Sequence, residues 1–192
     1  MTVDSGGCFD PLQNVSRETL DKLETYVSFL RRWNVKINLV SPNTLHHVWE
    51  RHIQDSAQIA CMAPEARTWV DIGSGAGLPG LVVAALLEDL NPYCSVTLIE
   101  SDVRKATFMI EVARAMRLNV KVLSQRIEDI ATSQFDVVSA RALAPLSKLL
   151  IYAKPLLARG GICIFMKGAG VWEELSSLKH DSNLEIERIP SV

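Results

Sequence analysis

The segment DIGSGAGLPG, residues 71–80, holds four glycines within eight positions: Gly73, Gly75, Gly77 and Gly80. Ordering a glycine costs more backbone entropy than ordering any other residue, so a run this dense indicates a loop whose backbone comes close to a ligand. Apolar residues lie on both sides, which predicts that the loop joins a buried strand to a helix. In a parallel α/β sheet such a junction faces the crevice where ligands bind. The loop is therefore the first candidate for a binding site.

The residues around the loop separate the ligands that it could hold. No Gly-Lys-Ser/Thr follows, so the loop is not a Walker A phosphate loop. Gly75, Gly77 and Gly80 form a GxGxxG, and Glu100 follows about 20 residues later, as in nicotinamide dinucleotide sites. Asp71, however, ends the predicted strand. We expect its carboxylate to face the crevice, where it would repel a pyrophosphate and suit a cationic amino-acid head group.

Gly73 lengthens the pattern to D-x-G-x-G-x-G, counted from Asp71. This longer pattern is typical of methyltransferases that use S-adenosylmethionine, a cofactor with an ammonium, a sulfonium and no phosphate. We therefore favour S-adenosylmethionine as the ligand. A dinucleotide, bound for hydride transfer or without catalysis, and a turn with a purely structural role remain the alternatives.

Two further segments are candidates for contact with the cofactor. Glu100 closes the next predicted strand, where a carboxylate can accept both ribose hydroxyls. In QRIED, residues 125–129, Ile127 can pack on the adenine face and Glu128 can lie beside its amino group. A plain helix start with acids near its positive end explains the same residues.

The chain divides into a helical first part and an alternating second part. Apolar spacing predicts helices over 16–33, with Ser16 as N-cap, and over 44–62, with Thr44 as N-cap. After residue 63, short apolar runs alternate with helical segments, which predicts a parallel, doubly wound sheet covered on both faces. We predict an N-terminal helical extension over 1–63 and one domain over 64–192. The expected strands are 68–72, 95–100, 119–123, 135–140 and 161–166, and residues 184–189 are a candidate for a sixth. The expected helices are 79–89, 102–117, 145–158 and 171–179.

Composition is that of an ordinary globular chain. The 192 residues are 48% hydrophobic and carry a net charge of −2. Four scattered cysteines form no CxxC pair, which argues against a disulfide framework or a zinc site. The histidine spacing (His46, His47 and His52) does not favour a metal site. No basic and apolar leader is present and no apolar run approaches the ~20 residues that span a bilayer, so we expect a cytoplasmic protein without membrane contact.

The order and spacing of six motifs resemble those of the RsmG family, also called GidB. The motifs are WN…INLVS (33–41), RHIQDS (51–56), DIGSGAGLPG (71–80), SQRIED (124–129), SARALAPL (139–146) and MKG (166–168). The resemblance spans about residues 16–170. It implies a class I S-adenosylmethionine-dependent methyltransferase fold, an α/β Rossmann-like, mostly parallel sheet. It also implies methyl transfer to N7 of a guanosine in the decoding-region loop of bacterial 16S rRNA. The family adds a last strand that this chain is expected to lack.

The resemblance also suggests where the cofactor lies. It places the cofactor against Gly73 and Leu78, with Ile127 and Glu128 at the adenosine and Arg141 beside the reactive centre. Arg141 is the single catalytic candidate; a structural ion pair with Asp71 or Asp136 is the alternative. The predicted cofactor-binding residues are Asp71, Gly73, Ser74, Gly75, Gly77, Leu78, Glu100, Ile127, Glu128 and Arg141.

The residues after the fourth predicted strand fit a ring nitrogen as methyl acceptor. N7 of guanine has a free lone pair and no proton to remove, so alignment matters more than a general base. The chain has SARALAP where enzymes that methylate amino groups carry Asp/Asn-Pro-Pro-aromatic, and Cys163 lies inside a predicted strand rather than at a nucleophile position. A methyltransferase for a small molecule or a protein is the alternative.

The charge distribution gives a candidate RNA surface. Residues 101–126 hold six Lys/Arg against two acids, although solvated helix faces explain such a run equally well. Arg51 is also a candidate for a pair with Asp55 that holds its helix to the sheet domain. We expect a monomer that acts on 16S rRNA or the small ribosomal subunit. The RNA-binding candidates are Arg31, Arg32, Lys36, Arg51, Arg104, Lys105 and Lys167.

Overall fold

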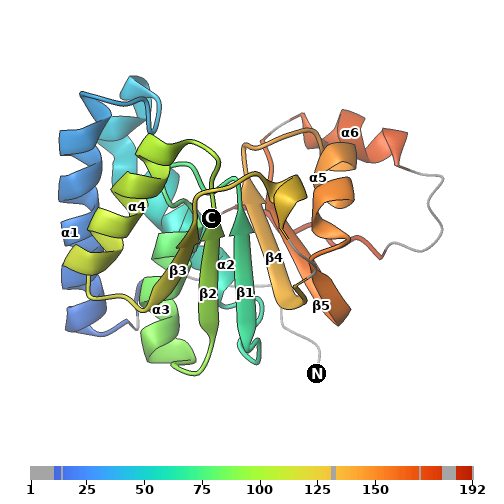
Figure 1. Ribbon diagram of the computed structural model, residues 1–192, viewed down its shortest axis with the longest axis horizontal. Helices are drawn as coiled ribbons and strands as arrows, with labels where there is room; N and C mark the ends of the chain where they lie inside the picture. The colour runs from blue at the N-terminus through green and yellow to red at the C-terminus, as the bar shows by residue number, and fades with distance from the viewer. Residues whose placement is uncertain (1–10, 14, 131–132, 169, 179–184, 192) are drawn as a thin grey trace.

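A five-stranded parallel sheet forms the centre of the protein (Figure 1). The computed structural model describes residues 11–13, 15–130, 133–168, 170–178 and 185–191. The strand order is β3-β2-β1-β4-β5 and all neighbours run parallel, as the alternation of strands and helices predicted. The strands are β1 (Thr68–Ile72), β2 (Ser95–Ile99), β3 (Val120–Leu123), β4 (Phe135–Arg141) and β5 (Leu157–Met166).

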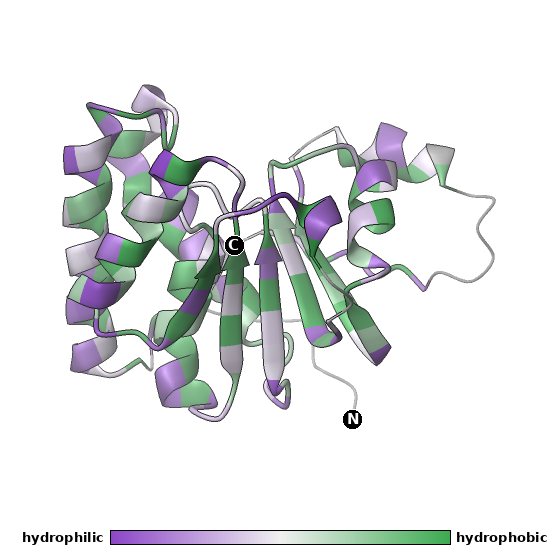
Figure 2. Ribbon diagram, viewed as in Figure 1, coloured by the Kyte–Doolittle hydropathy of each residue, from purple (hydrophilic) through white to green (hydrophobic). Residues whose placement is uncertain are grey.

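The strands are covered on both faces, because alternate side chains of each strand enter different cores. In β1, Trp69 packs into a core with residues of α1 to α4, whereas Val70 and Ile72 pack against α5. Figure 2 shows the hydrophobic residues along the strands and a more hydrophilic outer side on α1. The helices are α1 (Arg17–Asn34), η1 (Pro42–His47), η2 (Trp49–Gln54), α2 (Asp55–Ala60), α3 (Gly80–Leu90), α4 (Val103–Ala115), η3 (Ile127–Asp129), α5 (Leu146–Ala153) and α6 (Val171–Ser177).

The N-terminal helices share a core with the sheet. Leu23 and Leu30 of α1 are fully buried in the same cluster as Leu81 of α3 and Phe108 of α4. Rings of Trp33 and Phe108 meet edge to face, with their centroids 5.6 Å apart. The predicted helix over 16–33 is confirmed as α1, and the side chain of its N-cap accepts a hydrogen bond from the backbone of the first turn.

The single helix expected over 44–62 is wrong. The segment consists of the 3₁₀ helix η1, the π-helix η2 and the short α2, and the expected cap Thr44 lies inside η1. Buried Val48 and Ile53 are five residues apart, a spacing that suits one π turn better than one α turn. The π-helix therefore lets both side chains be buried, which the regular α-helical repeat would not.

The first five predicted strands and the four predicted helices of the sheet domain are confirmed with shifted boundaries. The largest shift follows Pro155, which cannot continue a helix, so α5 ends at Ala153 and β5 begins at Leu157. Of the sixth strand expected over 184–189, residue 184 lies outside the described residues. Within 185–191, which the structure describes, no strand is present.

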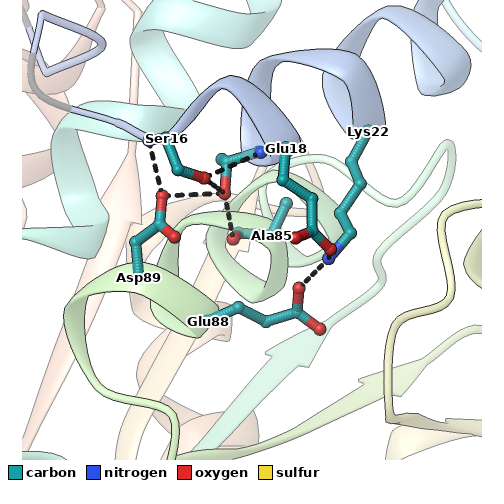
Figure 3. A network of polar contacts seen from close by, with 7 residues as sticks. Ser16, Glu18, Lys22, Ala85, Glu88 and Asp89 are labelled. Atoms are coloured by element: carbon teal, nitrogen blue, oxygen red, sulfur yellow. Dashed lines mark hydrogen bonds and ion pairs between the residues drawn. The ribbon is translucent and has the colours of Figure 1, made fainter.

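Polar contacts fasten the start of α1 to the end of α3 (Figure 3). The carboxylate of Asp89 accepts hydrogen bonds from the Ser16 backbone and the Thr19 hydroxyl, both at 2.8 Å. Beside it, Lys22 pairs with Glu88. These contacts set the angle at which α1 crosses the sheet domain.

We expect Asp89→Ala to lower the free energy of unfolding by about 2 kcal/mol, because it removes two hydrogen bonds to a charged acceptor at a helix start. The neighbouring variant Glu88→Ala is the matched control. It breaks a single ion pair, that with Lys22, and ion pairs near a surface are worth at most about 1 kcal/mol. Urea unfolding followed by tryptophan fluorescence measures both, and equal losses in the two variants would contradict this ranking.

Candidate functional site

The glycine loop leaves β1 in a left-handed backbone conformation. Gly73, Gly75 and Gly77 have φ angles of +63°, +56° and +79°, which L-residues with side chains rarely adopt. A Cβ on Gly73 would lie 2.4 Å from the side chain of Leu143. On Gly75 a Cβ would meet only a backbone oxygen 3.8 Å away, so this part of the loop leaves room for another molecule.

Asp71 does not face the crevice. The expectation that its carboxylate would contact a cationic head group there is therefore wrong. Its carboxylate is fully buried. Oδ1 accepts a hydrogen bond from the Ser139 hydroxyl at 2.8 Å, and Oδ2 accepts one from the Gly80 backbone at 3.3 Å. The indole of Trp69 donates to the same Ser139 hydroxyl. Asp71 therefore joins β1, β4 and the start of α3 from behind the loop.

Glu100 ties the loops after β1 and β2 together. Its two carboxylate oxygens accept hydrogen bonds from the backbones of Gly75 and Asp102, both at 2.8 Å. The side chain is 8% exposed. Each carboxylate oxygen has a second lone pair, so Glu100 can still accept hydrogen bonds from a ligand beside Gly75.

Ile127 and Glu128 lie in η3, directly after β3. Ile127 is half-buried against the core on the α5 face, and Glu128 is exposed. A hydrogen bond within Glu128 itself and one from Tyr152 of α5 lower the pKa of the Glu128 carboxyl. The structure therefore brings these residues to the carboxyl edge of the sheet, beside the strand that carries Glu100.

Arg141, the last residue of β4, is directed toward the N-terminal segment. Its Nη2 contacts Nδ1 of His52 in η2. Its Nη1 is buried and has no hydrogen-bond partner within the described residues. An unpaired buried donor is costly, so an acceptor supplied by a ligand would complete the site.

The structural alternatives for Arg141 are not found. No ion pair joins it to Asp71 or Asp136 in the part of the chain that the structure describes. Asp136 instead accepts hydrogen bonds at the other end of the strand, from the backbones of Arg67 and Thr68. Arg141 is therefore not held by a carboxylate at either end of the sheet.

Two contacts from the N-terminal helices were missed by the sequence reasoning. The buried Tyr26 hydroxyl of α1 donates to the Ala76 carbonyl, in the middle of the glycine loop, at 2.9 Å. His52 of η2 is a buried, hydrogen-bonded histidine, and one of its partners is Arg141. A signal existed for His52, because it stands in the RHIQDS motif. No sequence signal indicates the partner, which lies 89 residues away.

Several predicted RNA contacts share one edge of the molecule. Arg31, Arg32 and Lys36 are exposed at or after the end of α1, and Arg104 is exposed at the start of α4, with Lys105 half-buried beside it. Figure 1 places both helix ends at the edge where the carboxyl ends of the strands lie. A hollow of about 610 Å³ near this edge is lined by Glu24, Val27, Ser28, Arg31, Arg32 and Trp49.

Two other basic candidates have different surroundings. The Lys167 side chain is only 16% exposed, pairs with Glu174 at 2.8 Å and donates to the Ala144 carbonyl at 3.1 Å, so it is not free for a phosphate. Arg51 is exposed, and no Arg51–Asp55 ion pair is present among the described residues. Because η2 is a π-helix, the two side chains do not have the i, i+4 geometry of an α-helix.

The described residues contain neither a metal-ligand cluster nor a membrane-spanning helix. No cluster of three or more His, Cys, Asp or Glu side chains could hold a metal ion there. Within the same residues, every helix is too short or too polar to cross a membrane.

Comparison with known proteins gives a consistent result. The family model described as rRNA small subunit methyltransferase G (GidB) matches residues 19–190. A ribosomal RNA small subunit methyltransferase G from Jannaschia sp. is 49% identical over 179 residues, which are 93% of this chain and 85% of the relative. One from Parvibaculum lavamentivorans is 48% identical over 186 residues, 95% of this chain and 82% of the relative.

Solved structures with low sequence identity support the fold. A protein from Corynebacterium glutamicum has a TM-score of 0.59 at 16% identity, with 86% of this chain and 84% of that chain covered. A ribosomal protein L11 methylase from Lactobacillus delbrueckii subsp. bulgaricus has a TM-score of 0.52 at 20% identity, with 72% and 75% covered. The Rossmann-like α/β fold is thus confirmed.

The buried Asp71 predicts a pH-dependent stability. Burial raises the pKa of Asp71 to about 6 from 3.8, although the hydrogen bonds from Ser139 and the Gly80 backbone lower it. Between these pH values the folded protein keeps a proton that the unfolded chain has released, so stability falls as pH rises. Relative to Asp71→Asn, we expect the wild-type free energy of unfolding to fall by about 2 kcal/mol from pH 4 to pH 6.

Urea unfolding at a series of pH values measures this difference. Glu65→Gln, which removes an exposed carboxylate before β1, is the control and should run parallel to the wild type. Parallel curves for Asp71→Asn and the wild type would contradict the raised pKa.

Proposed function

The chain belongs to the rRNA small subunit methyltransferase G family, GidB, and on this premise we propose that it methylates N7 of a guanosine in 16S rRNA, with S-adenosylmethionine as methyl donor. The family match over residues 19–190 carries the proposal. The geometry supports it through the left-handed glycine loop, the acid after β2 and the arginine at the end of β4. All three lie at the carboxyl edge of a parallel sheet, where such folds bind their ligands.

The residues of the loop fit a cofactor of this shape. The open space beside Gly75 and the spare lone pairs of Glu100 suit a ribose with two hydroxyls. Ile127 offers an apolar contact for a purine at the next strand end. The cofactor supplies an electrophilic methyl group on a sulfonium. In the proposal it is held by Gly73, Ser74, Gly75, Gly77, Leu78, Glu100, Ile127, Glu128 and Arg141, and Asp71 holds the loop from behind.

The chemistry of the site fits N7 as acceptor. Guanine N7 attacks with its own lone pair and releases no proton, so the protein has to align the two reactants and exclude water. Arg141 can donate to O6 of the base beside N7 or to a neighbouring phosphate. Positive charge passes from the donor to the base during transfer, and no general base is required.

The exposed basic residues at this edge form the proposed RNA surface. Arg31, Arg32 and Lys36 at the end of α1 and Arg104 and Lys105 at the start of the neighbouring α4 lie on the same side of the sheet, near the carboxyl ends of the strands. Trp49 in the hollow beside Arg31 offers a ring for a base to stack on. Arg51 belongs to the same proposal, whereas Lys167 is excluded because of its internal ion pair.

Methyl transfer onto three RNAs tests the proposed function. Purified protein is incubated with radiolabelled S-adenosylmethionine and naked 16S rRNA, small ribosomal subunits or tRNA. We expect label on 16S rRNA, free or in the subunit, and chain cleavage at the labelled guanosine after borohydride and aniline treatment. Label without cleavage would contradict N7, and no label on any RNA would favour a small-molecule or protein substrate.

Glu100 should be required for binding of the cofactor. We expect Glu100→Ala to weaken S-adenosylmethionine binding at least about 10-fold, because it removes a charged acceptor whose hydrogen bonds are worth about 1.5–3 kcal/mol each. Glu100→Gln keeps one oxygen acceptor, and its affinity for S-adenosylmethionine should lie between those of the wild type and Glu100→Ala. Isothermal titration calorimetry measures the affinities, with Glu111→Ala on the exposed side of α4 as control. Unchanged affinity in a folded Glu100→Ala protein would remove Glu100 from the site.

A further inference from the structure

A chain of three hydrogen bonds connects Arg141 to the N-terminal segment. Nη2 of Arg141 contacts Nδ1 of His52, and Nε2 of His52 lies 2.8 Å from Oγ1 of Thr44. The Thr44 hydroxyl in turn lies 2.8 Å from the carbonyl oxygen of Ser41. Two polar side chains thus separate the end of β4 from a backbone carbonyl in a distant segment.

Only one direction of the hydrogens satisfies this chain. A guanidinium donates but never accepts, so Nδ1 of His52 must accept from Arg141. The imidazole proton is then on Nε2 and is donated to Thr44. The Ser41 carbonyl only accepts, so the Thr44 hydroxyl donates to it and has lone pairs left for His52. A protonated imidazole would place one N–H against another, so the contact requires neutral His52.

The surroundings keep His52 neutral. The side chain is 5% exposed, and burial followed by the charge of Arg141 lowers the pKa of His52 to about 4. Arg51 acts in the same direction, and Asp55 opposes it. Asp71 and Tyr26 face Arg141 from β1 and α1. At neutral pH the imidazole is therefore an acceptor for the guanidinium.

The backbone at both ends of the contact departs from regular structure. His52 lies in the π-helix η2, a rare conformation that is frequent at functional sites. Ala142, directly after Arg141, has a φ of +52°, a left-handed conformation that is unfavourable for a residue with a Cβ. Strain of this kind is retained where a side chain must be aimed.

From this geometry we propose that His52 is a positioning residue for methyl transfer. Neutral His52 holds Nη2 of Arg141 and so fixes the plane of the guanidinium, while the unpaired Nη1 remains for an oxygen acceptor of the reacting complex. The inference rests on the proposed function, in which Arg141 lies beside the reacting groups. It assigns to the N-terminal segment a direct part in aligning them.

Two substitutions at His52 test the role. His52→Leu removes the acceptor, and a misplaced guanidinium should lower kcat about 10- to 100-fold with a smaller change in the KM for rRNA. His52→Asn keeps an oxygen acceptor near the position of Nδ1 and should recover most of kcat. His47→Ala, an exposed histidine of the same segment, is the control and should leave kcat unchanged. Thermal melting shows that each variant is folded.

The outcomes separate positioning from mere packing. Full activity in folded His52→Leu, or equal losses in His52→Leu and His52→Asn, would overturn the proposal. A packing role would instead follow side-chain volume, and Leu would be tolerated better than Asn.

A measurement without turnover separates this proposal from the proposed function. NMR of the imidazole nitrogens in the free protein should show the tautomer with the proton on Nε2 and a pKa far below 6.5. Arg141→Met should raise that pKa, because it removes the largest charge next to the ring. If the imidazole proton of His52 in the wild-type protein is on Nδ1, the positioning role is overturned even if methyl transfer is active. If no RNA is methylated but this tautomer is found, the proposed function fails and the contact stands.

Discussion

The buried carboxylate of Asp71 is the interaction on which the site depends. Through Ser139 it joins β1 to β4, and through the Gly80 backbone it holds the start of α3. The loop between these points has three residues with positive φ, and such a backbone keeps its shape only when its two ends are fixed. Burial makes the charged form of Asp71 costly, so the position serves the loop at the expense of stability.

The N-terminal helices contribute side chains that contact the candidate site directly. Tyr26 reaches the middle of the glycine loop, and His52 reaches the end of β4. Both side chains can do so because α1 and η2 pack into the same core as α3 and α4. Fastening of α1 to α3 through Asp89 therefore bears on the geometry of the loop as well as on stability.

The surroundings of the site suit a reaction that needs alignment more than proton transfer. His52 is neutral and serves as an acceptor, and Asp71 is sealed behind the loop. The Arg141 guanidinium is a charged donor at this edge of the sheet, and its Nη1 has no hydrogen-bond partner in the described structure. A fixed positive donor beside a planar base fits the methylation of a ring nitrogen that has its own lone pair.

The parallel sheet, the glycine loop and the strand-end residues are predictable from the sequence, because apolar periodicity and the position of glycine are local signals. The sequence also carried the family motifs, including His52. No local pattern indicates that Asp71 points away from the crevice, that Lys167 pairs with Glu174, or that residues 44–60 are not one α-helix. These outcomes depend on partners far away in the chain. Burial and hydrogen bonding between Arg141 and His52, 89 residues apart, are set by packing, which no local pattern records.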